Sequence, residues 1–405
     1  MARLPGVETP EQVVCHVDMD CYYAACERLR EPELADEPLI VGMGYEAGEM
    51  HGAVATASYE AREYGVESAM AISEALELLP RRATADDPTD TGIYRPVDMA
   101  FYESVSEDVD EVLDDAAETV RNVSIDEAYL DLGDIAWDDA EAFGQQLKAD
   151  IEASAGVVAS VGIAPNMTTA KLASDADKPD GLVVVEPDGV REFLAPMDVA
   201  DLHGVGPVTA RELREMGFET AADIAAADEA ALVDAFGERG RDLYAQARGE
   251  DDREVEPKGR PKSLSSESAF LEATTDVAEK REKVHALAVE VAERASAKGA
   301  LYKTIGIKVV EPPFDVNTRA KSLSGPVDDP DLVTGVALDL LSEFEEPPVR
   351  KLGVRVSNLS FDDRDQASLD AWEQPESDGD DTDSDIRERH RSRSSGGQAD
   401  LSEFE

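Results

Sequence analysis

Cysteine, aromatic residues and long apolar runs are all scarce in this chain. Three of its 405 residues are cysteine and 5% are aromatic. Cys15, Cys21 and Cys26 form no Cys-x-x-Cys pair, which argues against a disulfide framework or a zinc site and predicts free thiols. No run of about 18 apolar residues, the length that crosses a bilayer, occurs in the sequence. These absences argue against membrane-spanning and disulfide-rich secreted proteins.

A targeting signal is also missing from the start of the sequence. Residues 1–12 contain acids and prolines where a signal peptide would carry an apolar stretch. We therefore expect a cytoplasmic protein without a membrane anchor. A chain of this length should divide into roughly two to four domains.

Positive charge is in short supply as well. Lys and Arg number 38 against 90 Asp and Glu, which gives a formal net charge of −52. The acids are spread over the whole length, a pattern typical of halophilic proteins, in which molar salt screens surface repulsion over about 3 Å. Residues 258–360 differ, with 15 Lys and Arg against 16 Asp and Glu. This balanced segment has the charge that a domain facing nucleic acid would need.

Strand and helix patterns alternate along the first half of the chain. An apolar strand is expected at residues 13–19, and apolar residues at helical spacing cover residues 98–117. The alternation predicts an α+β fold with a mostly antiparallel sheet. A separate helical unit is expected at residues 196–249, and residues 250–262 are polar and unpatterned, as in a linker.

A second α+β unit is expected after the linker. Its helices should lie near residues 277–297 and 331–344, and its strands should include residues 303–310 and 353–359. Beyond residue 361 the sequence consists mainly of Asp, Ser, Glu and Arg with few apolar groups. We expect this tail to be disordered.

Two pairs of acidic residues stand at strand ends. Asp18 and Asp20 end the first strand, and Asp126 and Glu127 stand beside another. Gathering acids in this way is costly without a cation, and a pair of hard divalent ions with oxygen ligands makes it favourable. Solvated strand ends are the alternative, and either motif alone is weak evidence. Because side chains alternate along a strand, Asp126 and Glu127 can share one metal pair only if a turn or bulge lies there.

The two segments together carry a family resemblance. Residues 17–24 (VDMDCYYA) and 124–131 (SIDEAYLD) resemble the two signature motifs of the Y-family, lesion-bypass DNA polymerases, in particular the DinB or polymerase IV type. The resemblance runs from about residue 13 to residue 361 and implies a multidomain right-hand polymerase. Its expected parts are a palm (residues 1–21 and 91–187), small fingers (22–90), a helical thumb (188–249), the linker (250–262), an α+β little finger (263–361) and the tail (362–405).

The resemblance also implies catalytic roles. Asp18 and Asp126 would bridge two Mg²⁺ ions, and Glu127 would complete the site that activates the primer 3′-hydroxyl. The Met19 carbonyl would be a further ligand. One ion would lower the pKa of the attacking hydroxyl, and the other would neutralise the triphosphate and the departing pyrophosphate. Asp20 matches a motif acid that is not usually a direct ligand, so it is left out of the site.

Four residues resemble the triphosphate clamp of the family. Tyr59 and Arg62 are i,i+3 neighbours at an expected helix start, which favours an anion. Thr56 and Lys178 complete the set. Without the resemblance, an ordinary amphipathic surface is the better interpretation of the Tyr59–Arg62 pair. Lys171 is a weaker candidate that also fits a solvated helix position.

Two features bear on which nucleotide is selected. Tyr23 matches the aromatic steric gate that leaves no room for a ribose 2′-hydroxyl, and a core tyrosine is its alternative interpretation. Ala53, Ala55 and Ala69 match positions over the nascent base pair, where small side chains give a loose roof. The resemblance therefore implies dNTP substrates and translesion synthesis of low fidelity.

Primer–template DNA is expected to meet two regions of the chain. Residues 201–210 resemble a helix-hairpin-helix, whose Gly204-x-Gly206 turn presents backbone N–H groups to phosphates without reading sequence. A bare Gly-x-Gly is weak evidence, and a plain helix connection is the default. In the little finger, the expected contacts to the DNA backbone are basic residues, each of which alone could be a solvated surface group. They are Lys303, Arg319, Lys321, Arg350, Lys351 and Arg355.

The last eight residues suggest a docking peptide. Gln398, Leu401 and Phe404 form a Gln-x-x-Leu-x-x-Phe pattern that resembles the peptide by which replication enzymes bind a sliding clamp. Glu405 departs from the pattern, because a second aromatic residue is usual there. Residues 366–372 (QASLDAW) are a second candidate.

Two other functions share parts of this pattern. A catalytically silent DNA-binding scaffold of the same fold would not need all three carboxylates. A two-metal phosphohydrolase would not need a steric gate or a helix-hairpin-helix. We therefore expect a monomeric DNA-directed DNA polymerase that uses two Mg²⁺ ions.

Overall fold

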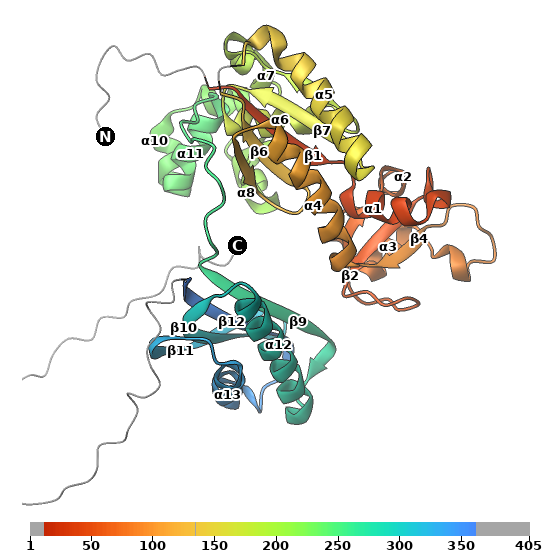
Figure 1. Cartoon of the computed structure of the whole chain (residues 1–405), viewed down its shortest axis with the longest axis vertical. Coiled ribbons are helices and arrows are strands. Elements are labelled where there is room, and N and C mark those ends of the chain that lie inside the picture. Colours follow the sequence, from red (N-terminus) through yellow and green to blue (C-terminus); the bar gives the residue numbers. More distant parts are fainter. Residues whose placement is uncertain (1–11, 134, 362–405) are drawn as a thin grey trace, which may run out of the picture. The chain divides into compact units, whose positions relative to one another are not determined.

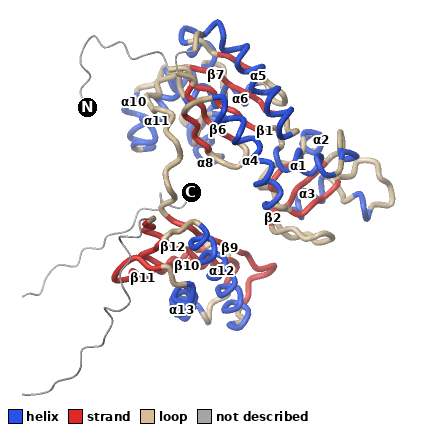
Figure 2. Tube along the Cα trace, in the orientation of Figure 1, coloured by secondary structure: helices blue, strands red, loops and turns tan. Residues whose placement is uncertain are grey.

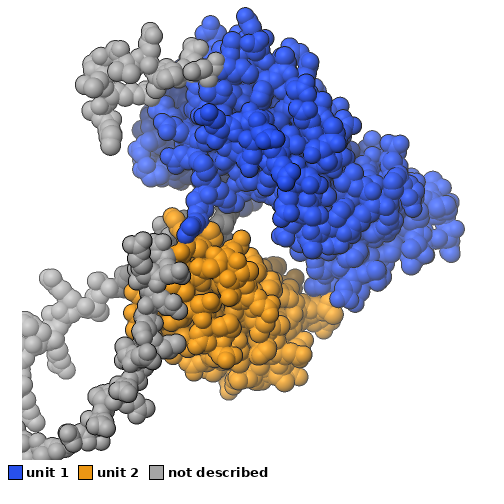
Figure 3. Space-filling view, viewed as in Figure 1, with its two compact units in different colours: residues 1–260 blue, residues 261–405 orange. Residues whose placement is uncertain are grey.

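The computed structural model describes residues 12–133 and 135–361, which divide after residue 260 into two compact units (Figure 3). Each unit has sheets and a core of its own. The expectations for the first residues and for the tail, including both clamp-binding candidates, lie outside the described residues. Within the described part of the chain, no helix combines the length and apolar character needed to cross a membrane.

A five-stranded sheet forms the centre of the first unit and corresponds to the expected palm (Figures 1 and 2). Its order is β5-β6-β1-β7-β8, and every neighbouring pair is antiparallel except β7 and β8. The prediction of a mostly antiparallel sheet is therefore confirmed. The strands are β1 (Val14–Met19), β5 (Thr119–Asn122), β6 (Glu127–Asp131), β7 (Ala159–Ala164) and β8 (Leu182–Val184).

Helices cover both faces of this sheet, which explains why β1 is buried along almost its whole length. On one face, α4 (Met99–Ala116) and α5 (Trp137–Ala155) share an apolar core with β1. On the other face, α6 (Met167–Ala176) packs against β7. Side chains cap two of these helices, since Asp98 accepts a hydrogen bond from the Phe101 N–H and Asn166 accepts one from the Thr169 N–H.

A small three-stranded sheet of order β3-β2-β4 forms the expected fingers. Strand β4 pairs in parallel with β2, so this sheet extends beyond residue 91, where the palm was expected to resume. The strands are β2 (Leu39–Met43), β3 (Ala53–Ala57) and β4 (Ile93–Pro96). The helices of this region are α1 (Tyr22–Arg30), α2 (Tyr59–Arg62) and α3 (Ile72–Leu78), with 3₁₀ turns η1 (Pro32–Leu34) and η2 (Arg82–Thr84).

The expected thumb is helical, and its core includes residues of the palm such as Val14 and Tyr129. The linker after it has no helix or strand, yet Val255 is only 5% exposed and belongs to the same core. The first half of the linker is thus packed on the first unit. The elements of the thumb region are η3 (Pro187–Gly189), α7 (Val190–Leu194), η4 (Val199–Asp201), α8 (Pro207–Glu215), α9 (Ala221–Ala225), α10 (Glu229–Phe236) and α11 (Glu238–Ala247).

The second unit is a four-stranded antiparallel sheet of order β11-β10-β12-β9 with two helices on one face. Alternate residues of β10 and β12, such as Ile305 and Val356, point into the core beneath the helices. The other face is open. The elements are β9 (Ser263–Thr274), α12 (Val277–Ala297), β10 (Leu301–Glu311), β11 (Asp315–Val327), α13 (Pro330–Leu341), η5 (Ser342–Phe344) and β12 (Val349–Ser360).

Candidate active site

A tight turn places Asp126 beside the end of β1. The backbone N–H groups of Val123 and Ser124 both donate to the Glu127 carbonyl, at 3.0 and 3.3 Å, and β6 begins only at Glu127. The turn that the alternation argument required is therefore present. The Met19 N–H donates to the Asp126 carbonyl at 2.9 Å, which joins the two acidic motifs directly.

Asp18 and Glu127 face each other as register partners of β1 and β6. The ammonium group of Lys171, on α6, lies 2.8 Å from Asp18 Oδ2 and 2.9 Å from Glu127 Oε2. Lys178 Nζ lies 2.6 Å from the other oxygen of Asp18. Burial alone would raise the pKa of Asp18, but the two ammonium groups outweigh burial and lower it. Residues 100 or more positions apart thus converge on one charged cluster.

Asp126 has no comparable cation. Burial raises its pKa; the Ser124 hydroxyl, at 2.6 Å, opposes this, and the nearby carboxylates of Asp18 and Glu127 add to it, so that the pKa is raised overall. The negative charges of these neighbouring carboxylates repel one another, and a bound cation would relieve that repulsion. Hard divalent ions prefer oxygen ligands, so the donor set fits the expected metal pair.

The carboxylates are not arranged as a finished metal site. Among the residues that the structure describes, no group of three or more His, Cys, Asp or Glu side chains is positioned to hold a metal ion. Lys171 supplies the physical reason, because its ammonium group lies between Asp18 and Glu127 and draws both toward itself. Metal binding would require Lys171 and Lys178 to release these oxygens.

A fully buried histidine, His16, contacts Glu127. His16 Nε2 lies 3.5 Å from Glu127 Oε2, and His16 Nδ1 lies 2.8 Å from the Ser174 hydroxyl. The His16 ring also packs edge-on against Tyr129, with ring centroids 4.5 Å apart. The contact with His16 lowers the pKa of Glu127 to about 2, with Lys171 acting in the same direction against the effect of burial. His16 therefore packs in the core and also contacts a carboxylate of the candidate site.

Two residues of the expected triphosphate clamp, Tyr59 and Lys178, contact acids of the first motif. Tyr59 and Arg62 share the short helix α2, where the Arg62 guanidinium lies 4.8 Å from the centroid of the Tyr59 ring. The Tyr59 hydroxyl donates to Asp20 Oδ1 at 3.0 Å, which links α2 to the end of β1. Thr56 lies in β3, paired with Val41 of β2. Together with the Lys178–Asp18 contact, these links bring fingers and palm residues to one site.

Tyr23 lies at the start of α1, half-buried beside the carboxylates. Its ring stacks on Tyr102 of α4, with centroids 4.6 Å apart and an interplanar angle of 18°. Burial, and then the nearby charge of Asp126, raise the pKa of Tyr23. A rigid ring next to Asp126 is the geometry that a steric gate needs.

Comparison with known proteins agrees with this geometry. The model of the impB/mucB/samB family matches residues 17–175, the model of its C-terminal domain matches residues 261–370, and the model of the IMS family HHH motif matches residues 187–218. DNA polymerase IV of Halobacterium salinarum is 62% identical over 91% of this chain and 90% of that protein. DNA polymerase IV of Methanoculleus marisnigri is 39% identical over 90% of this chain and 99% of that protein.

The chain belongs to the DNA polymerase IV family. Solved structures agree with this membership in the Y family. A chimera of the Y-family polymerases Dbh and Dpo4 has a TM-score of 0.76 and 28% identity, and covers 86% of this chain and 100% of its own. An insertion ternary complex of Dbh DNA polymerase has a TM-score of 0.61 and 27% identity, and also covers 86% of this chain and 100% of its own. The expected multidomain polymerase fold is thereby confirmed.

The polymerase thumb contains the expected hairpin between helical turns. Gly204 has a φ of +77°, a left-handed conformation that glycine adopts without strain. Gly206 is the N-cap of α8, and Pro207 occupies the first turn. The unsatisfied N–H groups at the start of α8 are suited to a phosphate oxygen.

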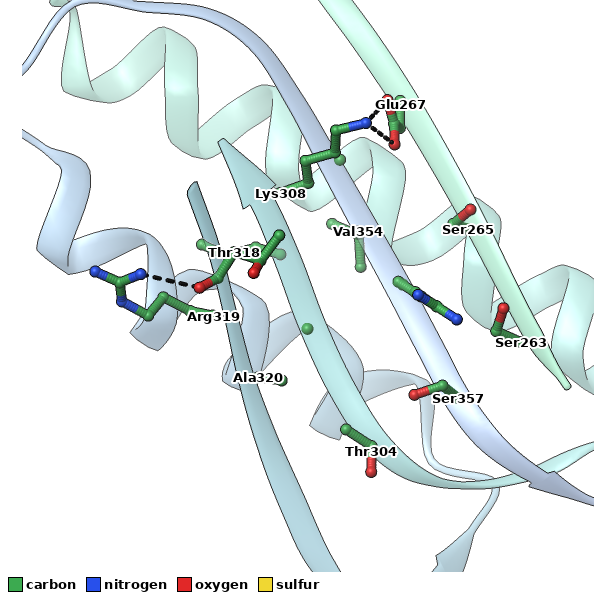
Figure 4. Close-up of a pocket in the computed structure, with 14 residues that line it drawn as sticks. Ser263, Ser265, Glu267, Thr304, Lys308, Thr318, Arg319, Ala320, Val354 and Ser357 are labelled. Atoms are coloured by element: carbon green, nitrogen blue, oxygen red, sulfur yellow. Dashed lines mark hydrogen bonds and ion pairs between the residues drawn. The ribbon is translucent and has the colours of Figure 1, made fainter. Parts of the chain in front are cut away.

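The open face of the little-finger sheet carries a cleft of about 270 Å³ lined by small polar, charged and apolar side chains (Figure 4). Gly306 and Gly353 have no side chains to fill the middle of this face. A Cβ at Gly353 would lie 2.8 Å from the Glu267 side chain. The Glu267 carboxylate forms ion pairs with Lys308 at 3.1 Å and with Lys351 at 2.5 Å. The remaining small polar residues around the cleft are Ser263, Ser265, Thr304, Thr318 and Ser357.

The six basic residues predicted to contact DNA are not all on this face. Arg355 lines the cleft, and Lys351 pairs there with Glu267 at 2.5 Å. Arg319 also lines the cleft, although its guanidinium is directed to Glu343, at 2.7 Å, and to the Phe344 ring. Lys321 pairs with the core-facing Ile305, so alternation directs it toward the helix side of the edge strand β11. Lys303 lies at an irregularity of β10, and Arg350 lies over the exposed Phe314 ring.

Proposed function

We propose that this polymerase performs low-fidelity translesion synthesis by transferring a nucleotide from a dNTP to a primer 3′-hydroxyl, with Asp18, Asp126 and Glu127 as the catalytic carboxylates. The observation that carries the proposal is the direct joining of the two acidic motifs by the Met19–Asp126 hydrogen bond. Mg²⁺ is the expected cofactor, and two such ions would lower the pKa of the attacking hydroxyl and neutralise the leaving pyrophosphate.

The three carboxylates would have different roles, according to their positions in the site. Asp18 presents both oxygens to cations, as its contacts with Lys171 and Lys178 illustrate, and would hold the metals together with Asp126 and the Met19 carbonyl. Glu127, which His16 contacts at 3.5 Å, would complete the site of the primer hydroxyl. Lys178, once released from Asp18, would join Arg62, Tyr59 and Thr56 around the triphosphate.

Primer–template DNA is the proposed polymer partner. The α8 start, with Gly204 and Gly206, would hold the backbone of the duplex through N–H groups. The cleft, which Arg355 and Arg319 line and where Lys351 pairs with Glu267, would hold it through side chains. Lys303, Lys321 and Arg350 are more distant candidates. The acidic remainder of the chain fits a salt-rich cytoplasm, in which a monomer would be joined to a sliding clamp by the terminal peptide.

The test is primer extension with the variant Asp126→Asn in Mg²⁺ and molar KCl. We expect incorporation to fall roughly a thousandfold or more, because one of the ligands that gather the metals is lost. The exposed Asp115, on the same unit, is the matched control, and Asp115→Asn should extend normally. Near-normal extension by Asp126→Asn would refute the assignment. Shortening of the primer by the wild type would favour the phosphohydrolase, and DNA binding without extension would favour the silent scaffold.

A further inference from the structure

Asp20, the motif acid left out of the metal site, is the centre of a buried hydrogen-bond network. Its carboxylate is 8% exposed and lies just beyond β1. It accepts bonds from three segments that are distant in sequence. The Ser160 hydroxyl of β7 lies 3.0 Å from each carboxylate oxygen, the Asp180 N–H lies 2.7 Å from Oδ2, and the Tyr59 hydroxyl lies 3.0 Å from Oδ1.

One branch of the network leads to Arg62. Because the Tyr59 hydroxyl donates its hydrogen bond to Asp20, the Tyr59 ring is held in one orientation. The Arg62 guanidinium lies over that ring and its Nε donates to the Ala57 carbonyl at 3.0 Å. Asp20 therefore positions a cation that it does not touch.

The other branch leads to Lys178. The loop at residues 177–181 carries Lys178 two positions before Asp180, whose N–H bonds Asp20. The same loop is held at Gly181, whose N–H donates to Ser160 Oγ at 3.1 Å, and by Lys148, which pairs with Asp180 Oδ1 at 2.9 Å. A second cation is thus anchored, through backbone, to the same carboxylate.

We propose that Asp20 is a positioning residue that sets the spacing of Arg62 and Lys178, and so determines dNTP affinity without taking part in the chemistry. This inference rests on the proposed function in one respect, namely that both cations hold the triphosphate. A carboxylate suits the position because it is an acceptor only, with room for several donors. An asparagine would direct its own N–H groups at one of the Tyr59, Ser160 or Asp180 donors.

The test measures single-turnover incorporation against dNTP concentration for Asp20→Asn. We expect the apparent dissociation constant of the dNTP to rise about tenfold or more, while the rate at saturating dNTP stays within about threefold and the affinity for primer–template DNA is unchanged. Ser160→Ala removes one donor and should raise the same constant by a smaller factor. Asp115→Asn is the control that should change none of these quantities.

A double-mutant cycle separates positioning from a general loss of structure. If Asp20 acts through Tyr59, the effects of Asp20→Asn and Tyr59→Phe on dNTP affinity should not multiply, and the double variant should resemble the weaker binder of the two. Thermal midpoints of all variants identify any that fail to fold. In that case Ser160→Ala, which keeps the carboxylate and lies outside the expected triphosphate clamp, still decides the question.

The outcomes distinguish this inference from the proposed function. Unchanged dNTP affinity in the folded Asp20 and Ser160 variants would overturn the inference, as would effects that multiply fully in the cycle. A collapse of the saturated rate at unchanged affinity would also overturn it, because Asp20 would then act in the chemistry. None of these results concerns Asp126. The proposed function is tested separately, by the extension activity of Asp126→Asn and by what the wild type does to the primer.

Discussion

Tyr23 is the residue on which the proposed selection against ribonucleotides depends. Its ring is stacked on Tyr102 and lies near Asp126, so movement of the ring is opposed by packing. If Tyr23 is the steric gate, the ring excludes the 2′-hydroxyl and the phenolic hydroxyl is not needed.

We predict that Tyr23→Ala admits ribonucleotides. Discrimination, measured as the ratio of kcat/KM for dNTP to that for the matching rNTP, should fall at least about tenfold, which corresponds to about 1.4 kcal/mol of lost transition-state preference. Tyr23→Phe keeps the ring and should discriminate as the wild type does. A ratio that is unchanged in Tyr23→Ala would show that another group excludes the 2′-hydroxyl.

The residues of the candidate site differ in how far the sequence could predict them. Asp18, Asp126 and Glu127 stand in compact motifs, and the turn at Asp126 followed from strand alternation alone. The roles of Asp20 and His16 could not be predicted in this way. Their partners, Ser160, Asp180 and Ser174, are about 140 to 160 positions away, and hydrogen bonds between such distant polar groups leave no local pattern.

At the scale of elements, helices were predicted better than strands. The helix expected at residues 98–117 is α4 (Met99–Ala116), and the one expected at residues 277–297 is α12 with the same bounds. Strands β9 and β11 were missed. Several of their positions on the core side are polar as well. Ser266 and Ser268 of β9 pair with the core residues Val354 and Leu352, and Arg319 and Lys321 of β11 pair with the core residues Ile307 and Ile305. Neither strand therefore carries the apolar alternation from which strands are recognised.

The linker was also predicted only in part. Residues 250–262 lack regular structure, as expected, but Asp251 binds the start of α6, where it accepts bonds from the Thr168 N–H at 3.0 Å and the Thr168 hydroxyl at 2.8 Å. Arg253 pairs with the same carboxylate at 2.8 Å. Two further bonds join the linker to the β5–β6 region. The Arg121 side chain donates to the Glu256 carbonyl, and the Lys258 side chain donates to the Val123 carbonyl. A linker that carries polar residues can therefore be fixed by polar contacts.

The Asp251 contacts should make this attachment sensitive to acid. Burial would raise the pKa of Asp251, but the bonds from Arg253 and Thr168 outweigh it and lower the pKa to about 2. Because the folded pKa lies below the unfolded value of about 3.9, the stabilisation is complete above pH 4 and is lost as the pH falls toward 2. We predict that Asp251→Asn lowers the free energy of unfolding by about 2 kcal/mol at pH 7, since the side chain is 6% exposed.

Denaturant unfolding at constant KCl, at several pH values between 7 and 3, measures this difference. The gap between wild type and Asp251→Asn should narrow as the pH falls, because the protonated carboxyl resembles the amide. Glu254→Gln, at an exposed neighbouring position, should track the wild type throughout. A gap that stays constant with pH would show that shape, not charge, holds the linker.

For the whole molecule, charge is distributed very unevenly between the two units. Residues 1–257 carry a net charge of −41, whereas residues 258–360 carry −1. Repulsion in the first unit is screened only when the Debye length is short, about 3 Å at 1 M salt against about 10 Å at 0.1 M. The second unit carries little net charge and therefore has little repulsion to screen.

We predict that the two units respond differently when KCl is lowered from 3 M to 0.3 M. Hydrogen exchange followed peptide by peptide on the full chain should show protection in β1, β6 and β7 falling about tenfold or more, a loss of about 1.4 kcal/mol in opening free energy. Protection in β10 and β12 should change much less, because charge repulsion hardly contributes to their stability. Replacing the lost salt with sucrose, which stabilises compact states without screening charge, should leave this difference between the units in place. Equal loss of protection in both units would show that the acidity of the first unit does not make its stability depend on salt.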